Sequence, residues 1–385
     1  MKKGVLALSI AAAVSSFGVQ ANQQAIDELR QQVAEQQKQI EALADALDGQ
    51  STAGGAWYNK ATFGGYGELH YNNLNTKEGD GDKEEIDLHR FVLFFGYQYS
   101  DTVRFVSEFE IEHNVAGEGK NGEVEVEQAF IEWRYLNNHS LQAGVFLVPV
   151  GILNETHEPD TFYGVERNNV EKNIIPTTWW EGGVGVSGEF APGLNYDFAV
   201  TSGLKLAEGK YKIRDGRQKA SEAAANDFAY TVAINYSGIP GMVIGASGQI
   251  QSDLWQEQGE DNLGATLFEA HIDAEFGPVG IRALYARWDI DSDIEDVKVG
   301  ADLQTGFYVE PSYKITDSVG VFARFSEWDN QAGASSINTK TQQRDFGVNY
   351  WLTDTVVFKA DYQNVSAPHD SKETEGVNLG VGYSF

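Results

Sequence analysis

The sequence contains no cysteine among its 385 residues, so no disulfide framework supports the fold. It also has no apolar run of about 20 residues, the length that a membrane-spanning helix requires. Positive charge is scarce, because 28 Lys and Arg residues stand against 57 Asp and Glu, for a formal net charge of -29. This acidity argues against nucleic acid as a partner, since phosphates require basic patches.

Aromatic residues and glycine are abundant instead. The chain has 17 Tyr, 21 Phe, 8 Trp and 41 Gly, while its mean hydropathy is negative. A barrel that spans a bilayer has such a composition, because only one face of each strand is apolar.

The first part of the chain predicts export. Residues 1–21, "MKKGVLALSIAAAVSSFGVQA", place two lysines before a short apolar stretch and end in small residues, as a secretory signal peptide does. Residues 22–48 carry apolar side chains at heptad a and d spacing and predict a short periplasmic coiled coil. The alternative is a lone amphipathic helix, because so few heptads are marginal without a partner. We expect 49–61 to be a flexible linker and 62–385 to be the barrel.

Seven short connections with good turn chemistry divide the remaining sequence. They are residues 100–102, 137–139, 191–193, 238–241, 277–278, 316–318 and 353–355. Between successive turns lie a strand, a longer polar loop and a returning strand. The pattern predicts an all-β fold, a transmembrane antiparallel barrel of about 16 strands preceded by the coiled-coil helix.

The alternation within the strands supports a watery interior. Apolar side chains of residues 268–276 alternate with Glu269, Asp273 and Glu275, and carboxylates at strand period belong in a polar lumen. A soluble β-sandwich also alternates, but its apolar faces point inward. The last strand, "VNLGVGYSF", must pair with the first, "TFGGYGELHY", to leave no open edge in hydrocarbon. Its terminal aromatic, Phe385, resembles the signal that the outer-membrane assembly machinery recognises. We therefore expect the outer membrane of a Gram-negative bacterium, with lipid and lipopolysaccharide as neighbours.

One long connection suggests a family. Residues 149–178 follow the fifth expected strand, and their placement resembles the inward-folded third loop of porins. With the coiled coil, the stretches "GGYGELHY", "DLHRFVLFFGYQY" and "RFVSEFEIEH", and the terminal "GVGYSF", the chain resembles the phosphate-selective porin O and P family over residues 62–385. The resemblance implies a homotrimer of sixteen-stranded barrels that passes small anions, with basic side chains along the route to a constriction.

Candidate constriction residues come from the expected inward faces and from the third loop. They are Arg90, Arg104, Arg134, Arg167, Lys172, Glu155 and Glu158. The alternative for Arg167 and Lys172 is that they pair with acidic neighbours and fix the loop to the wall. A second basic loop, residues 205–219, could gather anions at the mouth, contact lipopolysaccharide phosphates, or simply be solvated.

The expected function is passive diffusion of small hydrophilic ions and solutes, with anions such as phosphate implied by the resemblance. The lumenal glutamates favour the alternative, a non-selective or cation-preferring channel. A barrel enzyme is a third alternative. The seven scattered histidines show no H-E-x-x-H pattern, so we expect no catalytic residue, cofactor or metal.

Overall fold

The computed structural model describes residues 57–77, 81–257, 262–291, 300–334, 338–368 and 372–385. The expected signal peptide and coiled coil lie outside these residues, as does most of the expected linker. The chain divides into two units, Met1–Lys60 and Ala61–Phe385. Of the first, only the short 3-10 helix η1 (Trp57–Lys60) is described.

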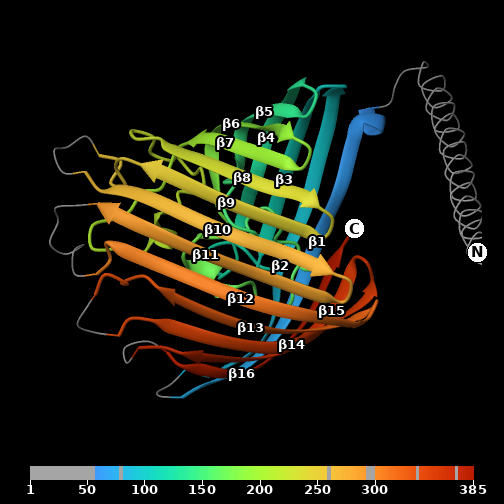
Figure 1. Ribbon diagram of the computed structural model, residues 1–385, viewed down its shortest axis with the longest axis vertical. Coiled ribbons are helices and arrows are strands. Elements are labelled where there is room, and N and C mark those ends of the chain that lie inside the picture. The colour runs from blue at the N-terminus through green and yellow to red at the C-terminus, as the bar shows by residue number, and fades with distance from the viewer. Residues whose placement is uncertain (1–56, 78–80, 258–261, 292–299, 335–337, 369–371) are drawn as a thin grey trace, which may run out of the picture. The chain divides into compact units, whose positions relative to one another are not determined.

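The second unit is a closed barrel in which every strand pairs with its neighbours in sequence (Figure 1). Its strands are β1 (Ala61–Thr76), β2 (Lys83–Ser100), β3 (Val103–Glu112), β4 (Val124–Leu136), β5 (His139–Leu147), β6 (Trp180–Ala191), β7 (Leu194–Thr201), β8 (Ala229–Ile239), β9 (Met242–Gln251), β10 (Gly264–Phe276), β11 (Val279–Asp291), β12 (Leu303–Thr316), β13 (Val319–Asp329), β14 (Thr341–Thr353), β15 (Val356–Ser366) and β16 (Thr374–Ser384). The sixteen-stranded antiparallel barrel expected from the sequence is therefore confirmed. A short helix, α2 (Asn169–Asn173), and a 3-10 turn, η2 (Ile213–Gly216), lie in connections.

Among the described residues, no helix combines the length and the apolar character needed to cross a membrane.

All seven expected short turns connect successive strands. They lie at one end of the barrel, which we call the turn end, and the longer connections lie at the opposite, loop end. Two connections matter below: residues 148–179, between β5 and β6, are called L3, and residues 202–228, between β7 and β8, are called L4.

The two ends of the barrel sequence close the sheet. Strand β16 pairs with β1 in a register that runs from Tyr66 opposite Ser384 to Thr76 opposite Thr374. Backbone hydrogen bonds of 3.0 and 2.9 Å between Gly65 and Phe385 extend this pairing to the last residue. Because both strands lose their free edge, no ladder donors or acceptors face the surroundings here.

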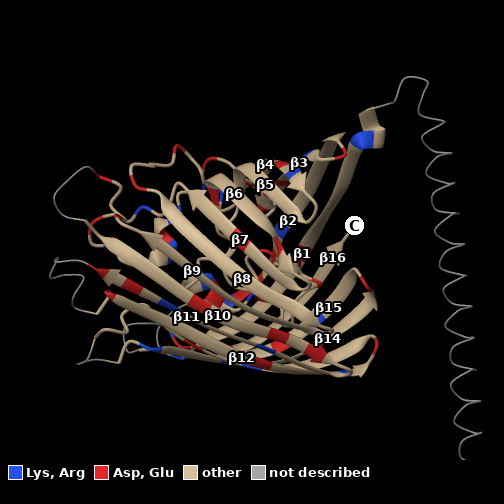
Figure 2. Ribbon diagram, turned by 45° about the horizontal axis from the view of Figure 1, so that its top comes forward, with Lys and Arg blue, Asp and Glu red and all other residues tan. Residues whose placement is uncertain are grey.

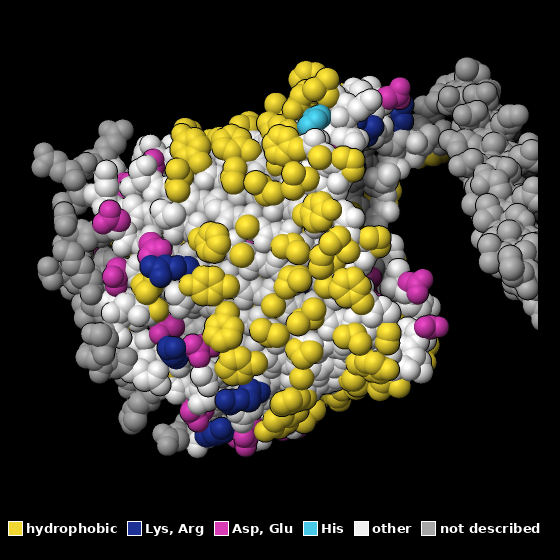
Figure 3. Space-filling view, viewed as in Figure 1, with side chains coloured by type: hydrophobic (Ala, Val, Ile, Leu, Met, Phe, Trp, Pro, Cys, Tyr) yellow, Lys and Arg dark blue, Asp and Glu magenta, His cyan; other side chains and the backbone are white. Residues whose placement is uncertain are grey.

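The strands present apolar side chains outward and polar side chains inward, as the alternation predicts. Phe268 is 53% exposed while its neighbour Glu269 is fully buried. Hydrophobic side chains cover the outer face toward the turn end, and charged side chains gather toward the loop end (Figure 3). Acidic and basic positions are interspersed along the strands (Figure 2).

Among the described residues, two register shifts (β-bulges) that lie away from the short turns interrupt this period of two. In β2, His89 has no partner in β1, because Glu68 pairs with Arg90 and Leu69 with Leu88. In β4, Glu127 is the extra residue opposite β3. A bulge sets two successive side chains toward the same face, and both residues join clusters inside the barrel.

Candidate functional site

L3 lies inside the barrel and contacts much of its wall. Its contacts come from widely separated strands: Asn72 of β1, Glu108 of β3, Glu127 of β4, Trp288 of β11, Arg324 and Ser326 of β13, Gln343 of β14 and Asp361 of β15. Two examples show the closeness. The backbone N–H of Val165 donates to Asp361 at 2.6 Å, and Asn169 donates to Gln343 at 2.6 Å. A segment with partners on both sides of the lumen must narrow it.

Asn154 joins the two ends of L3. Its side-chain amide donates to the carbonyls of Val148 (2.7 Å) and Trp179 (2.9 Å), and its oxygen accepts from the Trp179 N–H (2.7 Å). The residue is fully buried. Since an asparagine amide both donates and accepts, one side chain satisfies backbone groups from both ends of the loop.

Glu171, also fully buried, fixes the middle of L3. Its carboxylate accepts from the backbone N–H groups of Ile152 (3.0 Å) and Leu153 (2.6 Å) and from the Tyr308 hydroxyl (2.7 Å). These bonds connect the start of L3, helix α2 and the wall at β12. Charge-assisted bonds of this kind are stronger than neutral ones.

Inward-facing glycines give L3 the space it occupies. A Cβ on Gly382 of β16 would lie 2.5 Å from Pro159, and one on Gly306 of β12 would lie 2.7 Å from Val170. Real Cβ atoms essentially never come so close. The small residues that alternate with apolar ones in the last strand therefore admit the loop.

An apolar cluster fills one side of the lumen. It joins L3, L4, the β9–β10 connection and the inner wall at β10–β12: Val148, Val150, Val170, Ile174, Ile175, Trp179, Leu204, Leu206, Ile213, Leu254, Leu263, Ala265, Leu267, Leu284, Ala286, Trp288, Ile290 and Tyr308. Burial of this surface stabilises the inward position of both loops.

Three arginines of L3 and L4 converge on residues 172–178, a segment that begins with Lys172. Arg214 donates to the carbonyls of Lys172 (2.7 Å) and Thr177 (2.8 Å), and Arg217 donates to the carbonyl of Thr178 (2.5 Å). Arg167 donates to the Thr178 hydroxyl at 2.7 Å. We call Arg167, Lys172, Arg214 and Arg217 the basic cluster. Within the described part of the chain, none of its members forms an ion pair with a carboxylate.

The charges of this cluster affect one another. Burial, with the like charges of Arg217 and Arg167, lowers the pKa of Arg214. Partial removal from bulk water lowers the pKa of Lys172, which nevertheless reaches solvent; Glu166 opposes this shift, while Arg214 and Arg167 add to it. Carboxylates oppose this repulsion: Glu112 and Asp215 act to raise the pKa of Arg214, and Glu125 is the neighbouring charge that acts most strongly on Arg217.

The wall of β1–β4 carries acidic residues together with one buried guanidinium. Arg90 is 1% exposed; its Nε lies 2.7 Å from Glu68, and its Nη1 lies 3.6 Å from Glu110. Arg90 is therefore enclosed between carboxylates and is not open to the lumen.

The other residues predicted from sequence lie apart from the basic cluster. Arg104 pairs with Glu132 at 2.7 Å. Arg134 is exposed and lies close to the end of β4, just before the β4–β5 turn. Both arginines are therefore near the turn end. Glu155 is exposed and Glu158 is half-buried in the first part of L3. The structure brings together Arg167 and Lys172, but neither pairs with an acidic neighbour in the described residues.

Sequence reasoning placed residues 205–219 at the mouth, whereas the structure packs part of this loop inward. Leu206 and Ile213 are buried in the apolar cluster, and this anchors Arg214 and Arg217 against L3. The apolar residues Leu206 and Ile213 within an otherwise basic loop could have predicted from the sequence that part of the loop packs inward.

Three of the histidines meet at the inner wall. The rings of His70 and His89 stack with their centroids 4.7 Å apart, and the ring centroid of His113 lies 5.6 Å from that of His89. Asp87 lies 2.7 Å from His113 and 3.4 Å from His89. Asp87, His89 and His113 are close enough for a metal ion, which sequence reasoning missed because the bulge at His89 was not visible.

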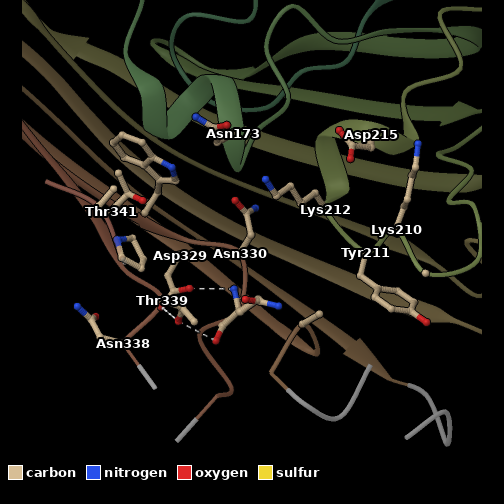
Figure 4. Close-up of a pocket in the computed structure, with 16 residues that line it drawn as sticks. Asn173, Lys210, Tyr211, Lys212, Asp215, Asp329, Asn330, Asn338, Thr339 and Thr341 are labelled. Carbon is tan, nitrogen blue, oxygen red and sulfur yellow. Dashed lines mark hydrogen bonds between the residues drawn. The ribbon is translucent and has the colours of Figure 1, made fainter. Parts of the chain in front are cut away.

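Two cavities flank L3. The larger, of about 950 Å³, is lined by polar residues from α2, L4 and the β13–β14 connection: Asn173, Lys210, Tyr211, Lys212, Asp215, Asp329, Asn330, Asn338, Thr339 and Thr341 (Figure 4). The smaller, of about 200 Å³, lies beside residues 160–163 and includes Glu275 and Lys314, which are near the turn end. Polar spaces on both sides of the loop suit the passage of hydrated solutes.

Comparisons with known proteins agree with this architecture. No family model matches the chain. The anion-selective porin from Comamonas acidovorans has a TM-score of 0.61 at 12% identity, over 84% of this chain and 99% of that chain. The outer-membrane channel DcaP of Acinetobacter baumannii has a TM-score of 0.58 at 15% identity, over 84% and 97%. Salmonella typhi OmpF, in complex with daunomycin, has a TM-score of 0.58 at 12% identity, over 84% and 97%. Identities this low show the fold alone.

A relative in sequence is more similar. An uncharacterised protein of Aquifex aeolicus (strain VF5) is 31% identical over 354 residues, which cover 84% of this chain and 80% of that protein. The chain therefore belongs to one family with this Aquifex aeolicus protein, and its barrel has the fold of the outer-membrane porins.

Proposed function

We propose that the protein is a passive channel for small hydrophilic solutes in the outer membrane, that it prefers anions, and that it has no enzymatic activity. The observation that carries the proposal is the basic cluster, which L3 and L4 hold inside a barrel already narrowed by L3. Selectivity follows the charges at the narrowest region rather than the total charge.

The way the cluster is held supports an interaction with anions. Arg214 and Arg217 are positioned by backbone carbonyls, so no directly bound carboxylate neutralises them in the described residues. Two buried donors at this place, the Thr177 hydroxyl and Nε of Arg217 itself, have no hydrogen-bond partner among the described residues. A phosphate-like anion would receive several charge-assisted hydrogen bonds here. This agrees with the resemblance to phosphate-selective porins and with the selectivity named for the Comamonas acidovorans structure.

The second candidate is a cation-preferring channel. It is favoured by acidic groups in the first part of L3, among them Glu155 and Glu158. We further propose a homotrimer, because one structural neighbour, an outer-membrane protein of Vibrio cholerae folded in vitro, has a trimer form.

The reversal potential across a potassium chloride gradient in planar bilayers tests the proposal. We expect anion preference, reduced chloride current when phosphate is added, and loss of both effects in the double variant Lys172→Gln, Arg217→Gln. Arg344→Gln is the matched control, because Arg344 is an exposed residue of β14 whose guanidinium lies over Phe325.

Cation preference in the unmodified protein, without any block by phosphate, would refute the anion proposal and favour the second candidate. Hydrolysis of lipid or peptide substrates by the purified protein, well above the rate of a mock preparation, would contradict the absence of enzymatic activity.

A further inference from the structure

We propose that Glu108, Glu127 and His157 bind a divalent metal ion of the zinc class, and that this ion fixes L3 to the β3–β4 wall. The three side chains come from the two strands of the wall and from L3. Their exposed fractions are 2%, 1% and 2%. An ion bound among them would join the loop to the barrel.

The distances suit a metal better than a hydrogen-bonded ion pair. His157 Nε2 lies 3.4 Å from a carboxylate oxygen of Glu108 and 3.4 Å from one of Glu127. Charge-assisted N–H···O bonds are shorter, at about 2.7–2.9 Å. Ligand atoms placed tetrahedrally around an ion at about 2.0–2.2 Å lie roughly 3.3–3.6 Å apart. Both nitrogen–oxygen distances thus have the spacing of a coordination shell, and all three ligand atoms lie within 4.8 Å of one another.

The orientation of the imidazole also fits a ligand. His157 Nδ1 lies 3.1 Å from the backbone carbonyl of Asn154, so its N–H donates there. This leaves the Nε2 lone pair directed at the two carboxylates, which is the usual arrangement of a metal-binding histidine. Asn154 is itself fixed by hydrogen bonds to Val148 and Trp179, so the hydrogen bond to its carbonyl fixes the orientation of the His157 ring.

Buried polar atoms without partners point to the same place. Within the part of the chain that the structure describes, neither His157 Nε2 nor Glu127 Oε2 has a hydrogen-bond partner. Glu108 is better supported, because Gln128 donates to its second oxygen at 2.7 Å and the Tyr66 hydroxyl lies 3.4 Å from the first. Leaving buried polar atoms unsatisfied is unfavourable, and a cation would satisfy both.

The charge balance of the wall favours a cation as well. Four carboxylates, those of Glu68, Glu108, Glu110 and Glu127, are at most 2% exposed. The permanent positive charge among them is Arg90. His70 contacts Glu68 and Glu166 rather than Glu108 or Glu127. A divalent ion would offset the remaining negative charge without requiring a proton on His157.

The donor set indicates the class of metal. One imidazole and two carboxylates suit zinc and similar first-row divalent ions, whereas magnesium and calcium prefer oxygen ligands alone. The competing arrangement is a protonated His157 held between the two carboxylates, with no metal.

Metal content of the purified, chelator-treated and zinc-reloaded protein tests the proposal. We expect about one tightly bound ion per chain, and affinity reduced by about 100-fold or more in His157→Gln and Glu127→Gln, since even changes around a ligand cost about 10- to 100-fold. Glu132→Gln is the matched control, because Glu132 is another β4 carboxylate and pairs with Arg104. His89→Gln tests the histidines at Asp87 and should leave the ion bound.

A wild-type protein that retains no zinc, or that loses it in His89→Gln but not in His157→Gln, would overturn the proposal. If the variants do not fold, X-ray absorption of the zinc-loaded wild type decides. One imidazole with oxygen ligands supports the site, and two imidazoles place the ion at His89 with His70 or His113. Metal content is independent of conductance, so this result does not depend on the proposed function.

Discussion

Replacing Asn154 by alanine should loosen L3 without unfolding the barrel. The change removes three buried hydrogen bonds, to the Val148 carbonyl and to both backbone groups of Trp179. At about 1 kcal/mol each, their loss amounts to about 3 kcal/mol. The Trp179 N–H also loses its side-chain acceptor, which adds about 1–2 kcal/mol. The two carbonyls retain other donors, namely the N–H groups of Val150 and Val148.

Hydrogen exchange followed by mass spectrometry measures this loosening. A free-energy change of about 4–5 kcal/mol raises the population of the open loop roughly 1,000-fold or more, and amide exchange of peptides from residues 148–179 should accelerate accordingly. Peptides from β10–β16 should exchange as before. The matched control is Asn173→Ala, which removes one bond, to the Asn169 carbonyl at 2.8 Å, and should accelerate exchange only about 5- to 10-fold.

Equal exchange in the wild type and Asn154→Ala would show that the apolar cluster, rather than Asn154, holds the loop. A uniform acceleration across all strands would show that L3 and the barrel unfold together. Either result would refute the separation of loop and barrel stability.

Three further perturbations address the loop and the N-terminal segment. Gly382→Leu should displace L3 at Pro159 and raise single-channel conductance while the heat-resistant barrel persists on unheated gels; unchanged conductance would contradict the space argument. Deleting residues 154–173 should raise conductance further and weaken ion selectivity in planar bilayers. Unchanged conductance would show that L3 does not form the narrowest region. Deleting residues 22–48 should weaken the expected trimer without abolishing the barrel; a trimer of equal heat resistance and equal light-scattering mass would assign that segment another role.

The turns, the strand number and the outward faces could be predicted because their causes are local. A turn depends on a few adjacent residues, and the face of a side chain depends on the parity of its position. The last strand shows both the reach and the limit of this reasoning. Its alternation indicated which side faces the lumen, but only the structure shows that Gly382 faces Pro159.

The clusters of histidine and carboxylate side chains around His89 and Glu127 could not be predicted, because they depend on how neighbouring strands pair in register. By strict alternation with Arg90, His89 would face outward, yet the bulge in β2 turns it toward His70. The bulge in β4 likewise adds Glu127 to the wall beside Glu108. No short-range signal in the sequence marks either bulge, since a bulge is a property of two strands rather than one.

The net charge of the chain is a poor guide to ion preference, because many charges are already compensated or far from the lumen. Arg90 is enclosed between Glu68 and Glu110, and neither the cation nor these anions faces a passing solute. Charges on outer connections are screened beyond about 10 Å at about 0.1 M salt. The basic cluster is neither paired directly with a carboxylate among the described residues nor far from the lumen. Its arginines are held by groups of residues 172–178 and lie inside the barrel. Under the proposed function, a solute entering from the loop end would meet cations that form no direct ion pair among the described residues, and the local balance of charge there, rather than the net charge, should govern selectivity.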